Sequence, residues 1–313
     1  MLILVKGQKI RRDMPHKLTK KIILALSLAL LADTVHGQIF VSYGSGTVGE
    51  YTEAGATVNA SLVSGINEIE GVAVSGDNLF VASFGGSIGQ YSTSGSTVNS
   101  SFITQLSYPS CLAVSGTSLY VAEAGSDTVG KYTTSGALVN YSLISGVNKP
   151  EGLAVSGNNL FVTSALNGTI GEYTTSGATV NARLVSGLNS PFGLAVSGNN
   201  LFVANDGNGT IGEYTLSGAT VNARLISGLH GAFGLAVDGN HLFVVNQGNG
   251  NPGTGSIGEY TTSGVTVNAS LVTGLDFPTF LAIEPVPEPS TMGLIGLGVA
   301  TFIQFRRRLN FVS

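Results

Sequence analysis

The sequence lacks tryptophan altogether and has a single cysteine, Cys111, among 313 residues. One cysteine excludes an intramolecular disulfide framework and any metal cluster that needs several thiolates. Charged residues are also scarce, at 10% of the chain, against the roughly 25% that is usual for soluble domains. The hydrophobic share of 43% still supplies enough material for a core, so global disorder is excluded.

The few basic residues are unevenly placed. Seven of the 14 lie before residue 22, and three more form a cluster at Arg306, Arg307 and Arg308. Between residues 38 and 284 there are 15 acidic and four basic side chains, which gives a formal charge of −11. Because such a field repels polyphosphates, nucleic-acid binding is excluded for this part of the chain.

The N-terminal segment has the layout of a secretory signal peptide. Its basic stretch is followed by the apolar run from Ile22 to Ala32 and then by small residues near Gly37. We expect a signal peptide over residues 1–37, cleaved after Gly37. The alternative is a core helix. Met14 begins a shorter form of the same signal, so translation starts either at Met1 or at Met14.

Three features follow one another in residues 285–313. They are the motif Pro287-Glu288-Pro289, the apolar run from Met292 to Phe305 and the cluster Arg306, Arg307 and Arg308. This order resembles the PEP-CTERM sorting signal of Gram-negative bacteria. The resemblance implies a hydrophobic helix that holds the precursor transiently in the inner membrane, with the arginines on the inner side.

The same resemblance implies a partner and a destination. An exosortase-type membrane protease is expected to cut near the motif, after which the protein is released or displayed outside the cell. The alternative is an ordinary C-terminal anchor that is never cut.

The middle of the chain is a repeat array. A Gly-Glu-Tyr-like motif recurs with tyrosine spacings of 40, 41, 41, 41 and 46 residues. Residues 170–204 and 211–245 are identical at 27 of 35 positions, which indicates duplication. A period near 40, with glycine or asparagine every few residues, predicts propeller blades of four short strands and excludes helical repeats.

One unit illustrates the expected blade. Gly193–Val196 predicts the first strand, and Leu201–Ala204 predicts a second strand that is apolar on both faces, as in a sheet packed between neighbours. Thr210–Thr215 and Val221–Ser227 complete the blade. The segments between these strands are rich in residues that tolerate a positive φ, so they predict tight hairpin turns.

Counting strands predicts six blades. First strands are expected to begin near Gly71, Cys111, Gly152, Gly193, Gly234 and Phe280, and second strands near Ile39, Leu79, Leu119, Leu160, Leu201 and Leu242. The array therefore starts with a second strand and ends with a first strand. We predict an all-β, six-bladed propeller over residues 38–284, closed by pairing of residues 280–283 with residues 39–42, which removes an open sheet edge. The alternative is an open array.

The stretch from Gly193 to Gly218, GLAVSGNNLFVANDGNGTIGEYTLSG, resembles the repeats of NHL-type and gluconolactonase-like propellers. The resemblance covers roughly residues 39–283. It implies architecture more than activity, because propellers serve as enzymes, scaffolds and binding modules alike.

Residues suited to catalysis are few between positions 38 and 284. His230 and His241 are the only histidines there, and we interpret His241 as a solvated turn residue. The residues before the first strands are Glu70, Ser110, Glu151, Phe192, Phe233 and Thr279. A set with two glutamates and two phenylalanines does not supply the converging oxygen ligands of a metal site. Cys111 is interpreted as a buried thiol that behaves as a small apolar side chain.

The best site that can be assembled lies at the expected channel mouth. It contains Glu70, Glu151, Asn205 and Asp206, with His230 as a further candidate. We interpret these residues as polar loop lining and expect no cofactor; the alternative is a Ca²⁺ or catalytic site on the axis. A second, more regular set on the third strands is interpreted as solubilising or blade-edge residues: Glu50, Gln90, Lys131, Glu172, Glu213 and Glu259.

These expectations favour a structural or adhesive protein over an enzyme. We expect an exported, exosortase-sorted propeller that acts as a binding module at the cell surface or in the extracellular matrix. The link of the sorting family with exopolysaccharide producers makes extracellular polysaccharide, or else a surface protein, the expected partner. The alternatives are an exported lactonase-like or lyase-like enzyme with an axial metal, and a spacer that has no ligand.

Overall fold

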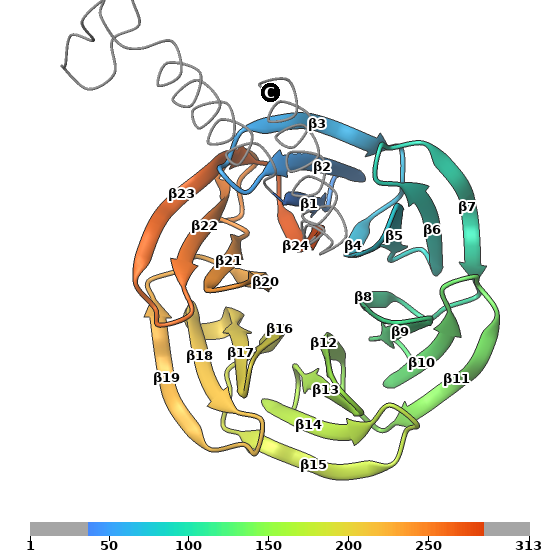
Figure 1. The fold of residues 1–313 in the computed structure, drawn as a ribbon, viewed down its shortest axis with the longest axis vertical. Helices are drawn as coiled ribbons and strands as arrows, with labels where there is room; N and C mark the ends of the chain where they lie inside the picture. Colours follow the sequence, from blue (N-terminus) through green and yellow to red (C-terminus); the bar gives the residue numbers. More distant parts are fainter. Residues whose placement is uncertain (1–36, 285–313) are drawn as a thin grey trace, which may run out of the picture. The chain divides into compact units, whose positions relative to one another are not determined.

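Six four-stranded antiparallel sheets surround a central axis in the computed structural model, which describes residues 37–284 (Figure 1). The predicted signal peptide and the predicted sorting segment, with Pro287, Glu288, Pro289 and the three arginines, lie outside the described residues. In the described part, no helix has the length and hydropathy needed to cross a membrane.

The sheets are called blades 1 to 6, in chain order with the composite blade last. Blade 1 contains β4 (Ile69–Ser75), β5 (Asn78–Ser83), β6 (Ser87–Ser92) and β7 (Thr97–Thr104). Blade 2 contains β8 (Pro109–Ser115), β9 (Ser118–Glu123), β10 (Thr128–Thr133) and β11 (Leu138–Ser145). Blade 3 contains β12 (Pro150–Ser156), β13 (Asn159–Ser164), β14 (Thr169–Thr174) and β15 (Thr179–Ser186).

Blade 4 contains β16 (Pro191–Ser197), β17 (Asn200–Asn205), β18 (Thr210–Thr215) and β19 (Thr220–Ser227), with the single helical turn η1 (Asp206–Asn208) after β17. Blade 5 contains β20 (Ala232–Asp238), β21 (His241–Asn246), β22 (Gly255–Thr261) and β23 (Thr266–Leu275). Blade 6 joins β24 (Pro278–Glu284) to β1 (Gln38–Tyr43), β2 (Thr47–Thr52) and β3 (Thr57–Ser64).

The predicted closure of the ring is confirmed. Strand β24 pairs with β1 in antiparallel register, with Ile39 opposite Ile283 and Val41 opposite Leu281. The Ser42 hydroxyl donates to the Glu70 carbonyl oxygen at 2.7 Å and accepts the backbone N–H of Phe280 at 3.0 Å. The seam therefore ties both ends of the array to blade 1, and no unpaired edge is left between the first and last strands.

The buried apolar residues lie between neighbouring blades, as predicted for a second strand that is apolar on both faces. Leu201, Phe202, Val203 and Ala204 of β17 have no solvent exposure at all. The larger side chains pack in clusters shared by adjacent blades; Phe80 of blade 1, for example, lies in one cluster with Leu119 of blade 2. Blade-to-blade packing, rather than one central core, therefore stabilises the ring.

The first strands begin about two residues earlier than predicted. Four of the six start with a proline, and proline at the first position of a strand leaves no ladder hydrogen bond unmade. As a result Glu70 and Glu151, which were expected to precede the strands, are the second residues of β4 and β12.

The recurring Gly-x-Tyr motif has a packing reason. A Cβ atom added at Gly212 would lie 2.8 Å from a ring carbon of Tyr214, and the equivalent glycines in the other blades meet their tyrosines at 2.7–3.0 Å. Residues two apart in a strand share one face. The tyrosine ring therefore folds back over a position where only glycine fits.

The outer strands carry a bulge at the same place in every blade. Around Tyr173, for example, β14 and β15 slip out of register between Ile170 and Tyr173. The Asn181 side chain accepts the backbone N–H of Arg183 at 3.1 Å within this bulge, and all six blades make the same contact. Bulges of this kind blunt an exposed sheet edge.

Candidate functional site

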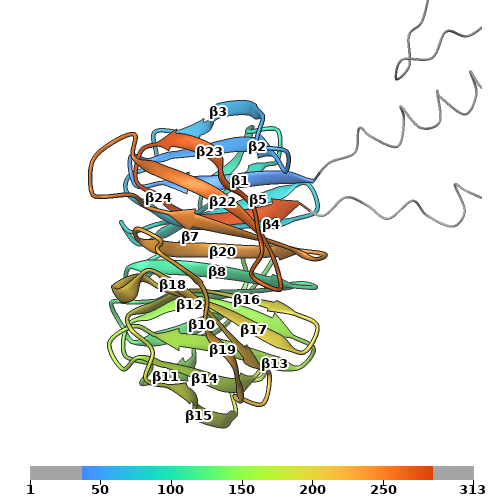
Figure 2. The ribbon, with the colours of Figure 1, turned by 90° about the vertical axis from the view of Figure 1, so that its left-hand side faces the viewer.

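The strand directions define two faces of the ring. Gln38 lies opposite Glu284 at one end of the closing strand pair, and Tyr43 lies opposite Pro278 at the other. We call the face with Gln38 and Glu284 the terminal face. We call the opposite face the mouth face; it is made by the starts of the first strands and by the loops that join second to third strands and fourth to first strands. Figure 2 shows the strands running between these two faces.

Six residues lie on the mouth face at the second position of the first strands: Glu70, Ser110, Glu151, Phe192, Phe233 and Thr279. The first strands are the innermost strands of the ring (Figure 1). They pack closely there, since a Cβ at Gly152 would lie 2.1 Å from the Phe192 carbonyl oxygen of the next blade. We call these six residues the axial ring.

Glu151 carries the ion pair of the axial ring. Its carboxylate lies 3.0 Å from the Lys149 ammonium group, and the Glu151 side chain is almost fully buried while that of Lys149 is half-buried. The same ammonium group lies over the Phe192 ring, 5.6 Å from its centroid. Burial raises the pKa of Glu151, whereas Lys149 and the Ser110 hydroxyl oppose that rise.

Glu70 is the second carboxylate of the axial ring. Burial, together with the negative charge of Glu151, raises its pKa to about 7. Within the described residues its side chain makes no hydrogen bond or ion pair of its own, because Lys149 binds Glu151. The site therefore holds one satisfied carboxylate beside one that changes protonation near neutral pH.

The other predicted site residues are placed as follows. Asp206 lies close enough to Lys149 to feel its charge, although burial raises its pKa overall. Asn205 is buried, donates weakly to the Thr210 hydroxyl at 3.4 Å and leaves its amide oxygen unpaired. His230 is exposed and lines a separate cavity of about 250 Å³ with Asn246 and Tyr260 of blade 5. The structure thus groups Glu70, Glu151 and Asp206 around Lys149, and His230 lies elsewhere on blade 5.

Two aromatic pairs accompany the charged residues on the mouth face. Phe192 and Phe233 of the axial ring have centroids 4.3 Å apart. Phe84 and Tyr108, from the loops of blades 1 and 2, have centroids 4.7 Å apart, and Tyr108 is 53% exposed. Partly exposed ring faces beside carboxylates offer both an apolar platform and hydrogen-bond acceptors.

The third-strand set was interpreted wrongly as solubilising residues. Glu213 is buried and accepts the Asn200 amide at 2.7 Å, and Glu172 accepts the Asn159 amide at 2.8 Å. His241 takes the equivalent place in blade 5, with Nδ1 2.6 Å from the Glu259 carboxylate. Together with Asn78 and Gln90 of blade 1, these pairs tie the start of the second strand to the third strand in blades 1, 3, 4 and 5. The available signal in the sequence was the recurrence of Asn at the start of the second strand together with Glu in the third strand, as in blades 3 and 4.

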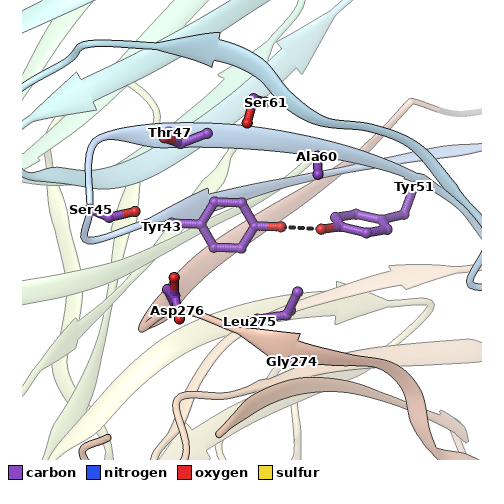
Figure 3. A pocket seen from close by; sticks show the side chains of 9 residues that line it. All are labelled: Tyr43, Ser45, Thr47, Tyr51, Ala60, Ser61, Gly274, Leu275 and Asp276. Carbon is purple, nitrogen blue, oxygen red and sulfur yellow. Dashed lines mark hydrogen bonds between the residues drawn. The ribbon is translucent and has the colours of Figure 1, made fainter. Parts of the chain in front are cut away.

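A further cavity lies at the seam of the ring (Figure 3). Its volume is about 210 Å³, and it is lined from both ends of the array, by Tyr43 and Tyr51 on one side and by Leu275 and Asp276 on the other. The Tyr43 and Tyr51 hydroxyl groups point toward each other and are hydrogen-bonded. Burial raises the pKa of Tyr43 strongly, and the bond to Tyr51 adds to this effect.

Cys111 behaves as expected for a buried thiol. It lies in β8 beside the axial ring, and burial raises its pKa to about 12, so the reactive thiolate is disfavoured at neutral pH. Among the described residues, no group of three or more His, Cys, Asp or Glu side chains is arranged to hold a metal ion.

Residues 285–308 match the family model described as the PEP-CTERM protein-sorting motif. The chain therefore carries this motif, as the sequence resemblance indicated, and the motif implies export and processing by an exosortase, a membrane protease. No curated protein matches the chain.

Solved structures match the ring. A chain of the nidogen/laminin complex has a TM-score of 0.67 at 16% identity, over 80% of this chain and 98% of that one. A protein of unknown function from Bacteroides caccae has a TM-score of 0.61 at 16% identity, over 81% of this chain and all of that one. Virginiamycin B lyase from Staphylococcus aureus has a TM-score of 0.50 at 21% identity, over 71% of each chain. At such identities the likeness extends to the propeller fold alone.

Proposed function

We propose that this protein is a binding and structural module of the cell surface or extracellular matrix, with extracellular polysaccharide as its partner. The observation that carries the proposal is that the propeller and the sorting motif are joined directly in the chain. Strand β24, which closes the propeller, ends at Glu284, and the sorting motif begins at the next residue. The exported cargo of the sorting signal is therefore the propeller itself.

The geometry of the ring supports a display role. Gln38 and Glu284 are partners in one ladder, so both ends of the propeller emerge on the terminal face. Only seven residues separate Glu284 from the apolar run that starts at Met292, and they reach at most about 25 Å when extended. The mouth face therefore carries neither end of the propeller.

The proposal is tested in cells that express the full chain. Alanine replacement of Pro287, Glu288 and Pro289 should shift the protein from the surface and medium to the inner-membrane fraction, as seen by fractionation and immunoblotting. The protein without substitutions should co-sediment with extracellular polysaccharide, and this co-sedimentation should be lost after the glycan is digested. Unchanged release of the motif variant, or no association with any glycan, would contradict the proposal.

A catalytic role is the second candidate, and one observation favours it. Glu70, with its raised pKa, and Glu151, paired with Lys149, are two carboxylates in different environments at one site. Such a pair suits general acid–base catalysis on a lactone or a glycan. If the protein is a lyase-like or lactonase-like enzyme, Glu70→Gln should abolish turnover and leave ligand binding intact.

A further inference from the structure

The six blades differ from one another mainly on one face. The outer strands repeat Val-Asn at the same place in every blade, and the first turn on the terminal face keeps Ser-Gly in blades 1 to 4. In contrast, the residue before each first strand is of a different type in every blade. These residues are Glu68, Tyr108, Lys149, Ser190, Gly231 and Phe277.

The other variable positions lie on the same face. The axial ring mixes carboxylate, hydroxyl and aromatic side chains. The loops after the second strands begin with five residue types in six blades, since only blades 2 and 3 share one, alanine. The longest of these loops, residues 247–254 of blade 5, also belongs to the mouth face. If duplicated blades had diverged without selection, their sequences would differ equally on both faces and on the outer strands. The concentration of differences on the mouth face therefore indicates that selection acts differently on its side chains.

The backbone conformation also indicates that mouth-face side chains are selected. All six residues before the first strands adopt a left-handed conformation, with φ between 46° and 68°. Glycine adopts it most easily, as Gly231 does in blade 5, yet five blades keep a larger side chain there. If only the turn mattered, glycine would serve at all six positions. The side chains are therefore retained for what they present to the mouth face.

The chemistry of the mouth face is acidic and aromatic. Seven carboxylates belong to it, Glu68, Glu70, Glu123, Asp127, Glu151, Asp206 and Asp276, against the single amine of Lys149. The two aromatic pairs lie among them. Lys149 itself shows how an ammonium group is held there, 3.0 Å from a carboxylate oxygen and over an aromatic ring.

We propose that the mouth face binds a polysaccharide bearing free amino groups, with sugar rings on the Phe84–Tyr108 and Phe192–Phe233 pairs and an ammonium group at Glu70. This inference rests on the proposed function and names the chemical class of its ligand. Sugar C–H groups carry partial positive charge and suit the negative face of an aromatic ring. An incoming ammonium group at Glu70 repeats what Lys149 does at Glu151, and the carboxylates attract such a polymer over a distance.

The test uses the full chain and four probes: a chitosan oligosaccharide, the same oligosaccharide after N-acetylation, dextran and alginate. Calorimetry should show binding to chitosan, at least tenfold weaker binding to its acetylated form, and weakening by salt. Glu70→Gln should lower the chitosan affinity at least tenfold. Asp238→Asn, the same charge change at the terminal-face turn of blade 5, should change it less than twofold.

A second variant guards against effects of misfolding. Tyr108→Gly keeps the left-handed turn, as Gly231 does, and removes one aromatic ring; it should weaken chitosan binding with the unfolding midpoint unchanged. Equal affinity for the two oligosaccharides, or tighter binding of polylysine at the same face, overturns the inference. Binding of dextran or alginate alone overturns it but leaves the proposed function standing, and binding of no glycan overturns both.

Discussion

At the scale of the residue, the axial ring holds a carboxylate, Glu70, whose ionised form is disfavoured by burial and by the charge of Glu151. The charge of Lys149 opposes these two effects only in part, so the pKa of Glu70 is raised to about 7. Folding therefore raises the free energy of the ionised Glu70 side chain. A residue that destabilises its own fold is expected where function, rather than packing, selects the side chain.

This predicts how stability changes with pH. Between pH 4.5 and about 7, Glu70 keeps its proton in the folded protein but loses it in the unfolded chain, so its contribution to stability falls as pH rises. Below that window both states are protonated and no penalty remains. Glu70→Gln should therefore raise the free energy of unfolding by about 1–3 kcal/mol at pH 8 and by much less at pH 4.

Urea unfolding at a series of pH values measures this difference. Asp238→Asn is the matched control, since it removes one carboxylate from the opposite face. A Glu70→Gln variant whose advantage over the parent stays constant across the range would show that the raised pKa of Glu70 is not present in solution.

At the scale of the element, contacts within the third and fourth strands explain most of the sequence motifs that recur from blade to blade. The tyrosine of the Gly-x-Tyr motif covers the glycine two residues before it, and the asparagine of the outer strand closes a bulge. The asparagine recurs in all six outer strands for this local reason, because its side chain accepts the backbone N–H of the residue two positions later, which is serine in four blades and arginine in two. The repeated motif thus builds the blade, whereas the mouth-face side chains, where we propose that the ligand binds, lie at the strand ends.

Gly212→Ala tests the packing of the third strand. The added methyl group would overlap the Tyr214 ring, and such overpacking should lower the free energy of unfolding by about 1–3 kcal/mol. Gly85→Ala is the control, because its nearest neighbour is the Ser83 hydroxyl oxygen at 3.4 Å. That change should be neutral or stabilising by up to about 1 kcal/mol. Equal effects of the two substitutions in thermal unfolding would refute the packing argument.

At the scale of the whole molecule, closure through β24 and β1 makes the ring one cooperative unit. The seam unites the two ends of the array, and its polar contacts reach blade 1 through the Glu70 carbonyl oxygen. Removing β24 would expose Ile39 and Val41, which are fully buried beside it. Each blade depends on two neighbours, so loss of one strand affects the entire circle.

A deletion and a permutation separate closure from connectivity. A chain that lacks residues 278–284 should lose its cooperative thermal transition and aggregate on size-exclusion chromatography. A permutant that links Glu284 to Gln38 and opens the exposed turn at Gly157 keeps every strand pair. Its melting temperature should stay within about 4 °C of the parent, which corresponds to roughly 1 kcal/mol. Cooperative unfolding of the deletion variant would contradict the role of the seam.

The sequence by itself determined the blade count, the strand order, the turns and the closing pair, because each depends on alternation, spacing and turn residues within about 41 positions. It also revealed the sorting motif, whose three parts are contiguous. Only the tertiary structure decided that Glu70 and Glu151 interact, that Lys149 binds just one of them, and that Glu213 is buried against Asn200. Such contacts depend on how blades converge on the axis and on how strands register across a sheet, and no local pattern carries that information.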